Sequence, residues 1–373
     1  MAIEVVPYTQ DRVEAVVAFN RRMREGRTGW GWYESCEDEW LPPRPGQRVW
    51  REHFLAVEDG SEVRGAYALK PHEWYVHGKP LLVTDWQGPV SEGLLSPKYS
   101  ALGLRLLRDM LKRRPLLYSW GHGGDEARML QMLRSLRWQL VGTPFCLRVL
   151  HPQRFLRLNR YLRQSARNRL LLDALAVTGI GWLGLTLFQG VLAARSRRSP
   201  GLEAEVVERF GDWADELWQR SMGCYRLIAL RDQATLNAVM PPGGWPPAIR
   251  LRVKREGGDI GWAAVMDNQL HDDARFGDLR VGTVIDCLAL PEDADDVIAA
   301  ATRFLATRGV DVLCSNQSHP RWIEAFARSG YVILRNRRYF VASPQLQQAM
   351  EPMEEARRGM HLTNLDGHGP HGF

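Results

Sequence analysis

Tryptophan and carboxylate side chains gather in one short stretch near the start of the chain. Trp30 and Trp32 stand beside Glu34, and further acidic residues follow up to Trp40. Aromatic rings stack on the apolar faces of sugars, and carboxylates accept hydrogen bonds from hydroxyl or amine groups. The stretch therefore predicts a substrate-binding loop for a sugar or an amine, with plain packing of the rings as the alternative.

Several classes of reaction have no motif in this chain. There is no P-loop, no HExxH zinc motif and no GxSxG nucleophile motif. The five cysteines are scattered without a CxxC pair, which predicts reduced thiols and no metal site. Since the first residues carry no secretory pattern, we expect a cytoplasmic protein.

A series of strands and a helix that could position such a substrate loop occurs twice along the chain. Near the end of each half, a short apolar strand leads into a polar corner, a helix, and a second strand that an aromatic residue opens. Arg128 precedes Trp138 by ten positions, and Arg321 precedes Tyr331 by the same ten. Similarity at such a long period indicates one folding unit used twice.

The length of 373 residues is large for one hydrophobic core, so two domains are the default expectation. Strand and helix patterns recur in the same order over residues 1–150 and 200–345. We expect two α/β domains with mixed β-sheets in these ranges, joined at 151–199 by a helical, partly hydrophobic linker. Residues 346–373 are expected to form a flexible tail.

The positive charge of the chain is concentrated in the linker. The net charge is +6, but residues 151–199 hold nine arginines and one acidic residue, so the rest carries −2. This location argues against nucleic acid as a partner. The apolar stretch Leu170–Ala194 is expected to form helices buried between the domains; an amphipathic segment on anionic lipid and a bilayer span are the alternatives.

The order of elements in both halves is that of a known acyltransferase fold. Each half has a hairpin, at residues 53–69 and 249–266, followed by a long strand, a helix and the strand–helix–strand ending. This order resembles the GNAT acyltransferases, so the chain looks like a tandem GNAT protein. The resemblance implies an acyl-coenzyme A co-substrate, with acetyl-coenzyme A as the first candidate, and a transfer that needs no metal ion.

The resemblance also implies where the coenzyme binds. The family carries Q/R-x-x-G-x-G/A between its fourth strand and the next helix, where backbone N–H groups face the pyrophosphate. The matching stretch here is Lys98-Tyr99-Ser100-Ala101-Leu102-Gly103, in which Lys98 replaces Gln or Arg and Ala101 replaces the first glycine. Val90, on the preceding strand, completes the expected cofactor-binding residues.

The equivalent turn of the second half departs from this pattern. Residues 291–296 contain no glycine and four carboxylates, which would repel a pyrophosphate. We therefore expect the second half to hold no coenzyme A in the family's manner. Asn316 stands at a corner where the family often contacts the pantetheine arm, so it is a candidate for substrate binding, with helix capping in this corner as the alternative.

The chemistry that the resemblance implies is attack of an amine or a hydroxyl on the thioester. Such an attack needs a base and a donor to the leaving thiolate. The base candidates are Asp85, His122 and Glu73, and Tyr118 is the candidate thiolate donor. Each has a structural alternative as a capping, turn or core residue.

The acceptor is expected to be a small molecule or a glycan. Tandem GNAT-like proteins of this kind are associated with bacterial polysaccharide or envelope assembly, which predicts an envelope or polysaccharide precursor and a location in the cytoplasm, peripheral on the inner membrane through residues 151–199. One alternative is a transferase of the peptidoglycan type that uses aminoacyl-tRNA. The other is a non-catalytic scaffold bound to a membrane or to a protein.

Overall fold

A computed structural model describes residues 3–37, 40–123, 128–163 and 200–367, with six isolated residues between 165 and 184. The first half contains, in chain order, β1 (Ile3–Pro7), α1 (Val13–Glu25), β2 (Glu52–Glu58), β3 (Glu62–Val76), β4 (Lys79–Ser91), the 3-10 turn η3 (Pro97–Tyr99), α2 (Leu102–Arg113), β5 (Leu117–Gly123), α3 (Arg128–Ser135) and β6 (Gln139–Val149).

The second half has a similar order. It contains α4 (Pro152–Leu158), β7 (Leu202–Val207), α7 (Asp212–Ser221), β8 (Leu227–Ala229), α8 (Gln233–Val239), β9 (Ile249–Arg255), β10 (Gly258–Gln269), β11 (Arg280–Ala289), α9 (Ala294–Thr307), β12 (Val312–Asn316), α10 (Pro320–Arg328) and β13 (Val332–Ala342). Of these elements, α4, β8 and α8 are in addition to the order of the first half. The chain then continues through α11 (Pro344–Ala349), α12 (Met353–Arg358), β14 (Met360–His361) and the 3-10 turn η6 (Asn364–Asp366).

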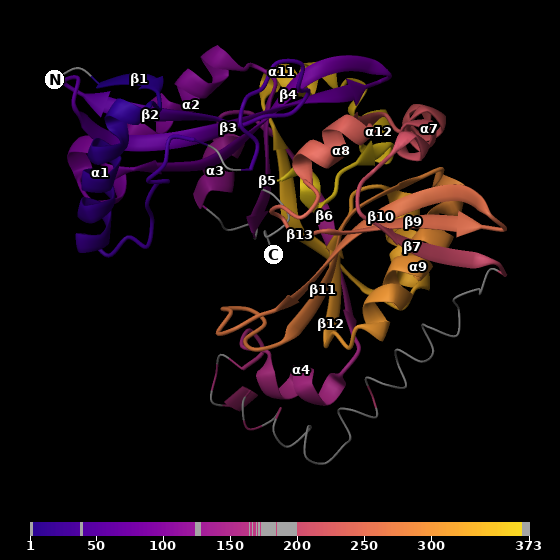
Figure 1. Cartoon of the computed structure of the whole chain (residues 1–373). Coiled ribbons are helices and arrows are strands. Elements are labelled where there is room, and N and C mark those ends of the chain that lie inside the picture. Colours follow the sequence, from indigo (N-terminus) through magenta and orange to yellow (C-terminus); the bar gives the residue numbers. More distant parts are fainter. Residues whose placement is uncertain are drawn as a thin grey trace.

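The strands of both halves form one continuous mixed sheet. Its order is β1-β2-β3-β4-β5-β13-β6-β12-β11-β10-β9-β7, and Figure 1 shows β13 beside β5 and β6 near the middle of the molecule. β13 of the second half is antiparallel to both β5 and β6, and β6 of the first half is antiparallel to β12. The last strand of each half therefore completes the sheet of the other half.

Helices cover both faces of the first half of the sheet. On one face, α2 buries Leu102, Leu106 and Met110 at helical spacing against the strands. On the opposite face, α1 buries Phe19 and Met23 in the same way. The mixed α/β class predicted from the sequence is thus confirmed, with the strands of the two halves interleaved in one sheet.

The chain between β13 and Gly367 packs into the interior, which differs from the flexible tail that the composition predicts from residue 346 onward. Leu346, Met350 and Met360 are buried in a core with first-half side chains. β14 pairs with β8, and β8 also pairs with β3, so this segment is tied to both halves. The last six residues of the predicted tail lie outside the described residues.

The start of the predicted linker packs against the second half. Phe155 of α4 joins a core cluster with residues of β11 and β12. Arg154 pairs with Asp311 at 2.9 Å, and Arg160 pairs with Asp272 at 2.9 Å. Most of the apolar stretch 170–194 lies outside the described residues. Among the residues that the structure describes, none belongs to a helix with the length and apolar character needed to cross a bilayer.

A buried arginine joins the C-terminal segment to the sheet. Arg231, which is 1% exposed, places its guanidinium 3.1 Å from Asp286 on β11 and 2.8 Å from Asp366 in η6. All three side chains are removed from water, so each charge depends on the others for compensation. Burial alone would lower the pKa of Arg231, but the two carboxylates outweigh it and raise that pKa.

We expect Arg231→Met to destabilise the protein by about 3–5 kcal/mol, because the substitution leaves two buried carboxylates without a cation. The free energy of unfolding is measured by urea titration with circular dichroism. Lys254→Met is the matched control, since the Lys254 ammonium pairs with Glu205 at 2.7 Å near the surface. Equal stability of wild type and Arg231→Met would contradict the role given to this arginine.

Candidate active site

Two parallel strands diverge in the first half of the sheet. β4 and β5 pair at Thr84 with Leu117 and at Asp85 with Tyr118. Three residues further along, Gly88 on β4 and Gly121 on β5 are both exposed, and both have positive φ angles, +55° and +114°. We call this diverging stretch, from the Asp85–Tyr118 pair to the two glycines, the first splay. Glycine at its mouth lets a ligand approach the backbone closely.

The equivalent strands of the second half diverge around a closed interior. β11 and β12 are parallel and pair up to Thr283 and Cys314, and the residues that follow on both strands are buried. The C-terminal segment fills this second splay. His361 lies 2.8 Å from the carbonyl of Cys287, and Asn316 donates a hydrogen bond of 2.8 Å to Asn364. The first splay is therefore the open one of the two.

The predicted coenzyme turn lies at the start of α2. Ser100, Ala101 and Gly103 are exposed, while Leu102 points into the core. The first N–H groups of a helix have no partner within the helix, so they are available to an anion. A Cβ on Gly103 would meet nothing within 4 Å outside its own helix backbone, so the backbone there is open to a ligand.

The side chains that precede this helix are already engaged. The Tyr99 hydroxyl donates to Glu58 at 2.8 Å, and the Lys98 ammonium lies 3.1 Å from the same carboxylate. The hydrogen bond from Tyr99, with those from Lys98 and Arg64, lowers the pKa of Glu58 to about 2. Lys98 and Tyr99 thus bind a carboxylate in this structure, and the Ser100 N–H donates to the carbonyl of Pro97 at 3.1 Å. The backbone from Ala101 to Gly103 is what the turn offers to a phosphate.

The aromatic loop reaches the first splay through one of its tryptophans. Trp32 is held by Asn20, whose amide donates to the Trp32 carbonyl at 2.8 Å and accepts from the Trp32 N–H at 2.7 Å. Its ring lies 3.4 Å from the position that a Cβ would take on Gly88. Trp30 is 60% exposed, and Glu34 bonds to Asn20 at 3.0 Å. The loop therefore roofs β4 with Trp32, while Trp30 faces solvent.

Two of the predicted catalytic residues meet at the base of the first splay. Asp85 is fully buried and accepts a hydrogen bond of 2.8 Å from Gln87. Tyr118 is also buried, and its hydroxyl donates to the carbonyl of Asp366 at 2.5 Å. Burial raises the pKa of Tyr118, and the nearby carboxylates of Asp85 and Asp366 raise it further. The Tyr118 proton is thus held by the C-terminal segment.

The other predicted residues lie elsewhere. Glu73 forms two hydrogen bonds with Arg48, at 2.6 and 2.7 Å, and pairs in register with Leu82, before the strands diverge. Val90 is buried near the end of β4. His122 follows Gly121 on β5, at the mouth of the first splay, but its side chain is outside the described part of the structure. Asn316, 1% exposed, lies in the second splay.

Four buried charged residues that the motifs do not indicate surround the base of the first splay. Lys70 pairs in register with Asp85 and donates to the carbonyls of Leu365, Asp366 and Gly367. Arg231, Asp286 and Asp366 form the ion-pair cluster described above. A sequence signal exists, since Lys70 and Arg231 each follow an uninterrupted apolar run, and a buried charge requires a partner.

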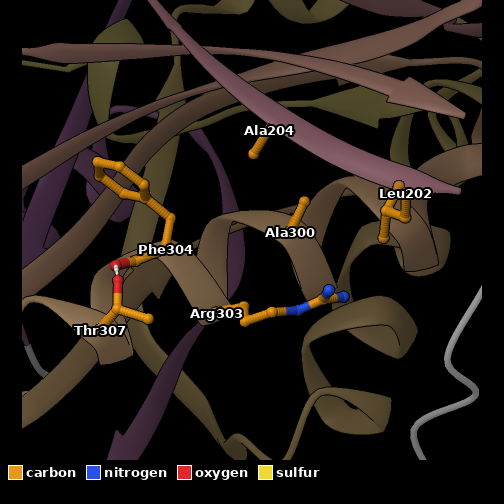
Figure 2. Close-up of a pocket in the computed structure, with 6 residues that line it drawn as sticks. All are labelled: Leu202, Ala204, Ala300, Arg303, Phe304 and Thr307. Atoms are coloured by element: carbon orange, nitrogen blue, oxygen red, sulfur yellow. Dashed lines mark hydrogen bonds between the residues drawn. The ribbon is translucent and has the colours of Figure 1, made fainter. Parts of the chain in front are cut away.

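A separate shallow cavity of about 180 Å³ lies between β7 and α9, at the far edge of the sheet (Figure 2). Leu202, Ala204, Ala300 and Phe304 line it, with Arg303 and Thr307 at its rim. The Thr307 hydroxyl is bonded to the carbonyl of Phe304. Because converging polar groups do not face this cavity, it is a weaker candidate than the first splay. The described residues include no group of three or more His, Cys, Asp or Glu side chains placed to hold a metal ion.

Comparisons with solved structures place this geometry in a known fold. A GCN5-related N-acetyltransferase from Anabaena variabilis is 10% identical, with a TM-score of 0.50 over 91% of this chain and 72% of that one. An N-myristoyltransferase of Saccharomyces cerevisiae with bound myristoyl-CoA and inhibitors is 11% identical, with a TM-score of 0.47 over 90% and 80% of the two chains. A GCN5-related N-acetyltransferase from Kribbella flavida is 14% identical, with a TM-score of 0.47 over 91% and 71%.

The chain thus has the fold of the GCN5-related N-acetyltransferases. No protein-family model matches its sequence, and no curated protein is similar to it in sequence. At this level of identity the likeness is one of fold, and the activity has to be argued from the site itself.

The buried cluster predicts an unusual pH dependence. Burial raises the pKa of Asp286 from 3.8 to about 6, and the neighbouring Asp366 adds to this, against the opposing effect of Arg231. The folded protein therefore holds this proton more tightly than the unfolded chain. The resulting stabilisation is present below about pH 4 and is lost as the pH rises through about 6.

We expect the stability of wild type relative to Asp286→Asn to fall by roughly 2–3 kcal/mol between pH 4 and pH 7. Urea unfolding of both proteins across this range measures it. The paired comparison removes the titration of distant groups, which both proteins share. A stability difference that stays constant or grows with pH would show that the carboxylate of Asp286 is ionised throughout this range.

Proposed function

We propose that the protein is an acyltransferase that uses an acyl-coenzyme A and binds it in the first half of the chain. One observation carries this proposal. Two exposed glycines lie at the mouth of the first splay on diverging parallel strands, and the chain that connects these strands forms α2, whose start is exposed. This combination offers a backbone-lined slot for an extended thiol arm and N–H groups for a pyrophosphate. The second half lacks both, since its splay is filled and its turn is acidic.

In this proposal the pyrophosphate lies at Ser100–Gly103 and the thioester lies between Gly88 and Gly121. The amine or hydroxyl of the acceptor attacks the thioester carbonyl, forms an amide or ester bond, and breaks the carbon–sulfur bond. A base takes the proton of the acceptor, and coenzyme A leaves as the thiol once the sulfur is protonated. His122 at the mouth of the splay is the candidate for the base, because Asp85 lies about 10 Å further down the strand and beneath Gly367 of the C-terminal segment. The Tyr118 hydroxyl would have to leave Asp366 before it could protonate sulfur.

We propose further that the acceptor is a sugar-containing precursor of the cell envelope or of a polysaccharide. Trp32 roofs the strand that carries Gly88, so an acceptor that reaches the thioester passes the aromatic loop. Trp30 and Glu34 lie on the outer part of this loop, where a ring to stack on and a carboxylate to accept hydroxyl hydrogen bonds suit a glycan. This acceptor class is supported by the composition of the loop and by the resemblance.

The location that fits this acceptor is the cytoplasmic face of the inner membrane, reached through residues 151–199. Arg157 on α4 is exposed and free to face anionic lipid, whereas Arg154 and Arg160 form ion pairs with the second half. We expect co-sedimentation with vesicles of phosphatidylglycerol and phosphatidylcholine that decreases with salt, and none with phosphatidylcholine alone. Absence of co-sedimentation with the anionic vesicles would remove the membrane from the proposal.

We expect acetyl-coenzyme A to bind in calorimetry with one site per chain, and Gly103→Glu to weaken this binding at least tenfold. A Cβ at this position meets nothing within 4 Å outside its own helix backbone, and a carboxylate suits the first turn of a helix, so the variant should fold. It would nevertheless repel the pyrophosphate.

Two controls make this test specific. Gly103→Ala adds bulk without charge at the same open position and should bind as wild type does. Glu292→Gln alters the exposed acidic turn of the second half and should also leave binding unchanged. If wild type binds no coenzyme A ester, the acyltransferase proposal fails. If Glu292→Gln rather than Gly103→Glu changes binding, the site lies in the second half.

A further inference from the structure

The C-terminal segment crosses the first splay just above its base. The carbonyl of Gly367 accepts a hydrogen bond of 3.4 Å from Gln87, which lies on β4 two residues beyond Asp85. On the other strand, Trp120 lies two residues beyond Tyr118, and its ring is 3.1 Å from the place where a Cβ on Gly367 would be. Gly367 therefore lies against the backbone of β5 at Trp120, whose carbonyl oxygen is 3.6 Å from the same Cβ position, and against the side-chain amide of Gln87 on β4. Both contact residues are one position below the exposed glycines.

This crossing is held firmly by buried donors. Lys70 donates to three successive carbonyls, those of Leu365, Asp366 and Gly367. Tyr118 adds a hydrogen bond to the Asp366 carbonyl, and Arg231 pairs with the Asp366 carboxylate at 2.8 Å. Lys70, Tyr118 and Arg231 are each at most 1% exposed. Moving the turn would leave several buried polar groups without partners, so the turn is a fixed part of the splay.

The position of the turn determines how deep the first splay is. A β-strand rises about 3.3 Å per residue, so the mouth at Gly88 lies about 10 Å from Asp85 along the strand. The turn occupies the level of Gln87 and leaves about 3 Å, the rise of one residue, below the mouth. A two-carbon acyl group fits in that depth, and an extended fatty acyl chain does not.

We infer that the turn Leu365–Gly367 is the floor of the acyl pocket and restricts the enzyme to short-chain acyl-coenzyme A donors, with Lys70 as the residue that positions this floor. The inference rests on the proposed function, because it assumes that the thioester lies between the two glycines. It assigns Lys70 no contact with the donor. Its ammonium acts on the pocket by holding three carbonyls in place.

Calorimetry with free coenzyme A and its acetyl, butyryl and octanoyl thioesters tests the inference. In an open apolar channel each added methylene tightens binding about fourfold. We expect no such gain, so octanoyl-coenzyme A should bind wild type no more tightly than acetyl-coenzyme A. An octanoyl affinity more than threefold above the acetyl affinity would overturn the inference and leave the proposed function intact. Failure of all four compounds to bind would instead overturn the proposed function.

Lys70→Met tests the positioning role, since it removes the donors of the three carbonyls. We expect the affinity ratio of octanoyl- to acetyl-coenzyme A to rise at least tenfold in this variant, and an unchanged ratio in the folded variant would contradict the role of Lys70. Gln87→Ala removes the β4 contact of Gly367 without removing a buried charge. Gln87→Ala should shift the ratio in the same direction, and it replaces Lys70→Met as the test if that variant does not fold.

The matched control is Ser318→Ala. The Ser318 hydroxyl donates to the carbonyl of Met360 and accepts from the N–H of Leu362, both at 2.7 Å. The substitution therefore loosens the same segment at the second splay. A general loss of stability in this segment would move the ratio in both variants, whereas a floor at Gly367 predicts that Ser318→Ala keeps the wild-type ratio.

Discussion

The burial of charge between the two halves is the constraint on which the rest of the structure depends. Arg231 follows β8, Asp286 lies on β11, and Asp366 belongs to the last described turn, so the ion pairs join three distant parts of the chain. None of these charges is tolerable without its partners in the interior. These ion pairs therefore fix the path of the C-terminal segment. Along this path it fills the second splay and limits the depth of the first.

Because of this path, the splay of the second half is filled and the splay of the first half is accessible. In the second half, β14 and η6 occupy the space between the diverging strands, and carboxylates stand at the start of α9. In the first half, the strands open at two glycines and α2 starts with exposed backbone. The two halves thus carry similar sets of strands, but an accessible splay is found in the first half. The second half supplies β13 and the anchoring charges to the first.

The sequence predicts the local elements of this protein better than their assembly. Alternating and helical patterns place the hairpins, α2 and α9 correctly, because these depend on neighbouring residues. They cannot reveal that β13 lies between β5 and β6, because strand neighbours from different halves leave no local pattern. The sequence of residues 346–367 gives no sign of their burial for the same reason, since Lys70 and Arg231, the partners of Asp366, are far away in sequence.

The candidate site likewise combines residues that the sequence predicts with contacts that only the assembled structure shows. Gly103 could be named from the sequence because the resemblance supplied its position. Asp85 and Tyr118 could be named because the resemblance calls for a base and a thiolate donor, and both lie on strands next to the predicted coenzyme turn. That Tyr118 donates to a backbone carbonyl of the C-terminal segment, and that Asn316 lies in the other splay, are properties of the assembled chain. A single charged residue after an apolar run, as at Lys70 and Arg231, is the available signal in the sequence. It indicates that a buried charge needs a partner but does not identify that partner.

The exchange of the last strands has a consequence for synthesis on the ribosome. β5 ends at Gly123, but its neighbour β13 begins at Val332, so 208 residues separate the two. At typical translation rates of about 5–20 residues per second, the edge of β5 waits on the order of 10–40 s for its partner. An unpaired strand edge is a template for association with other chains. The nascent first half is thus an aggregation-prone intermediate, and the cell has reason to shield it with a chaperone until the chain is complete.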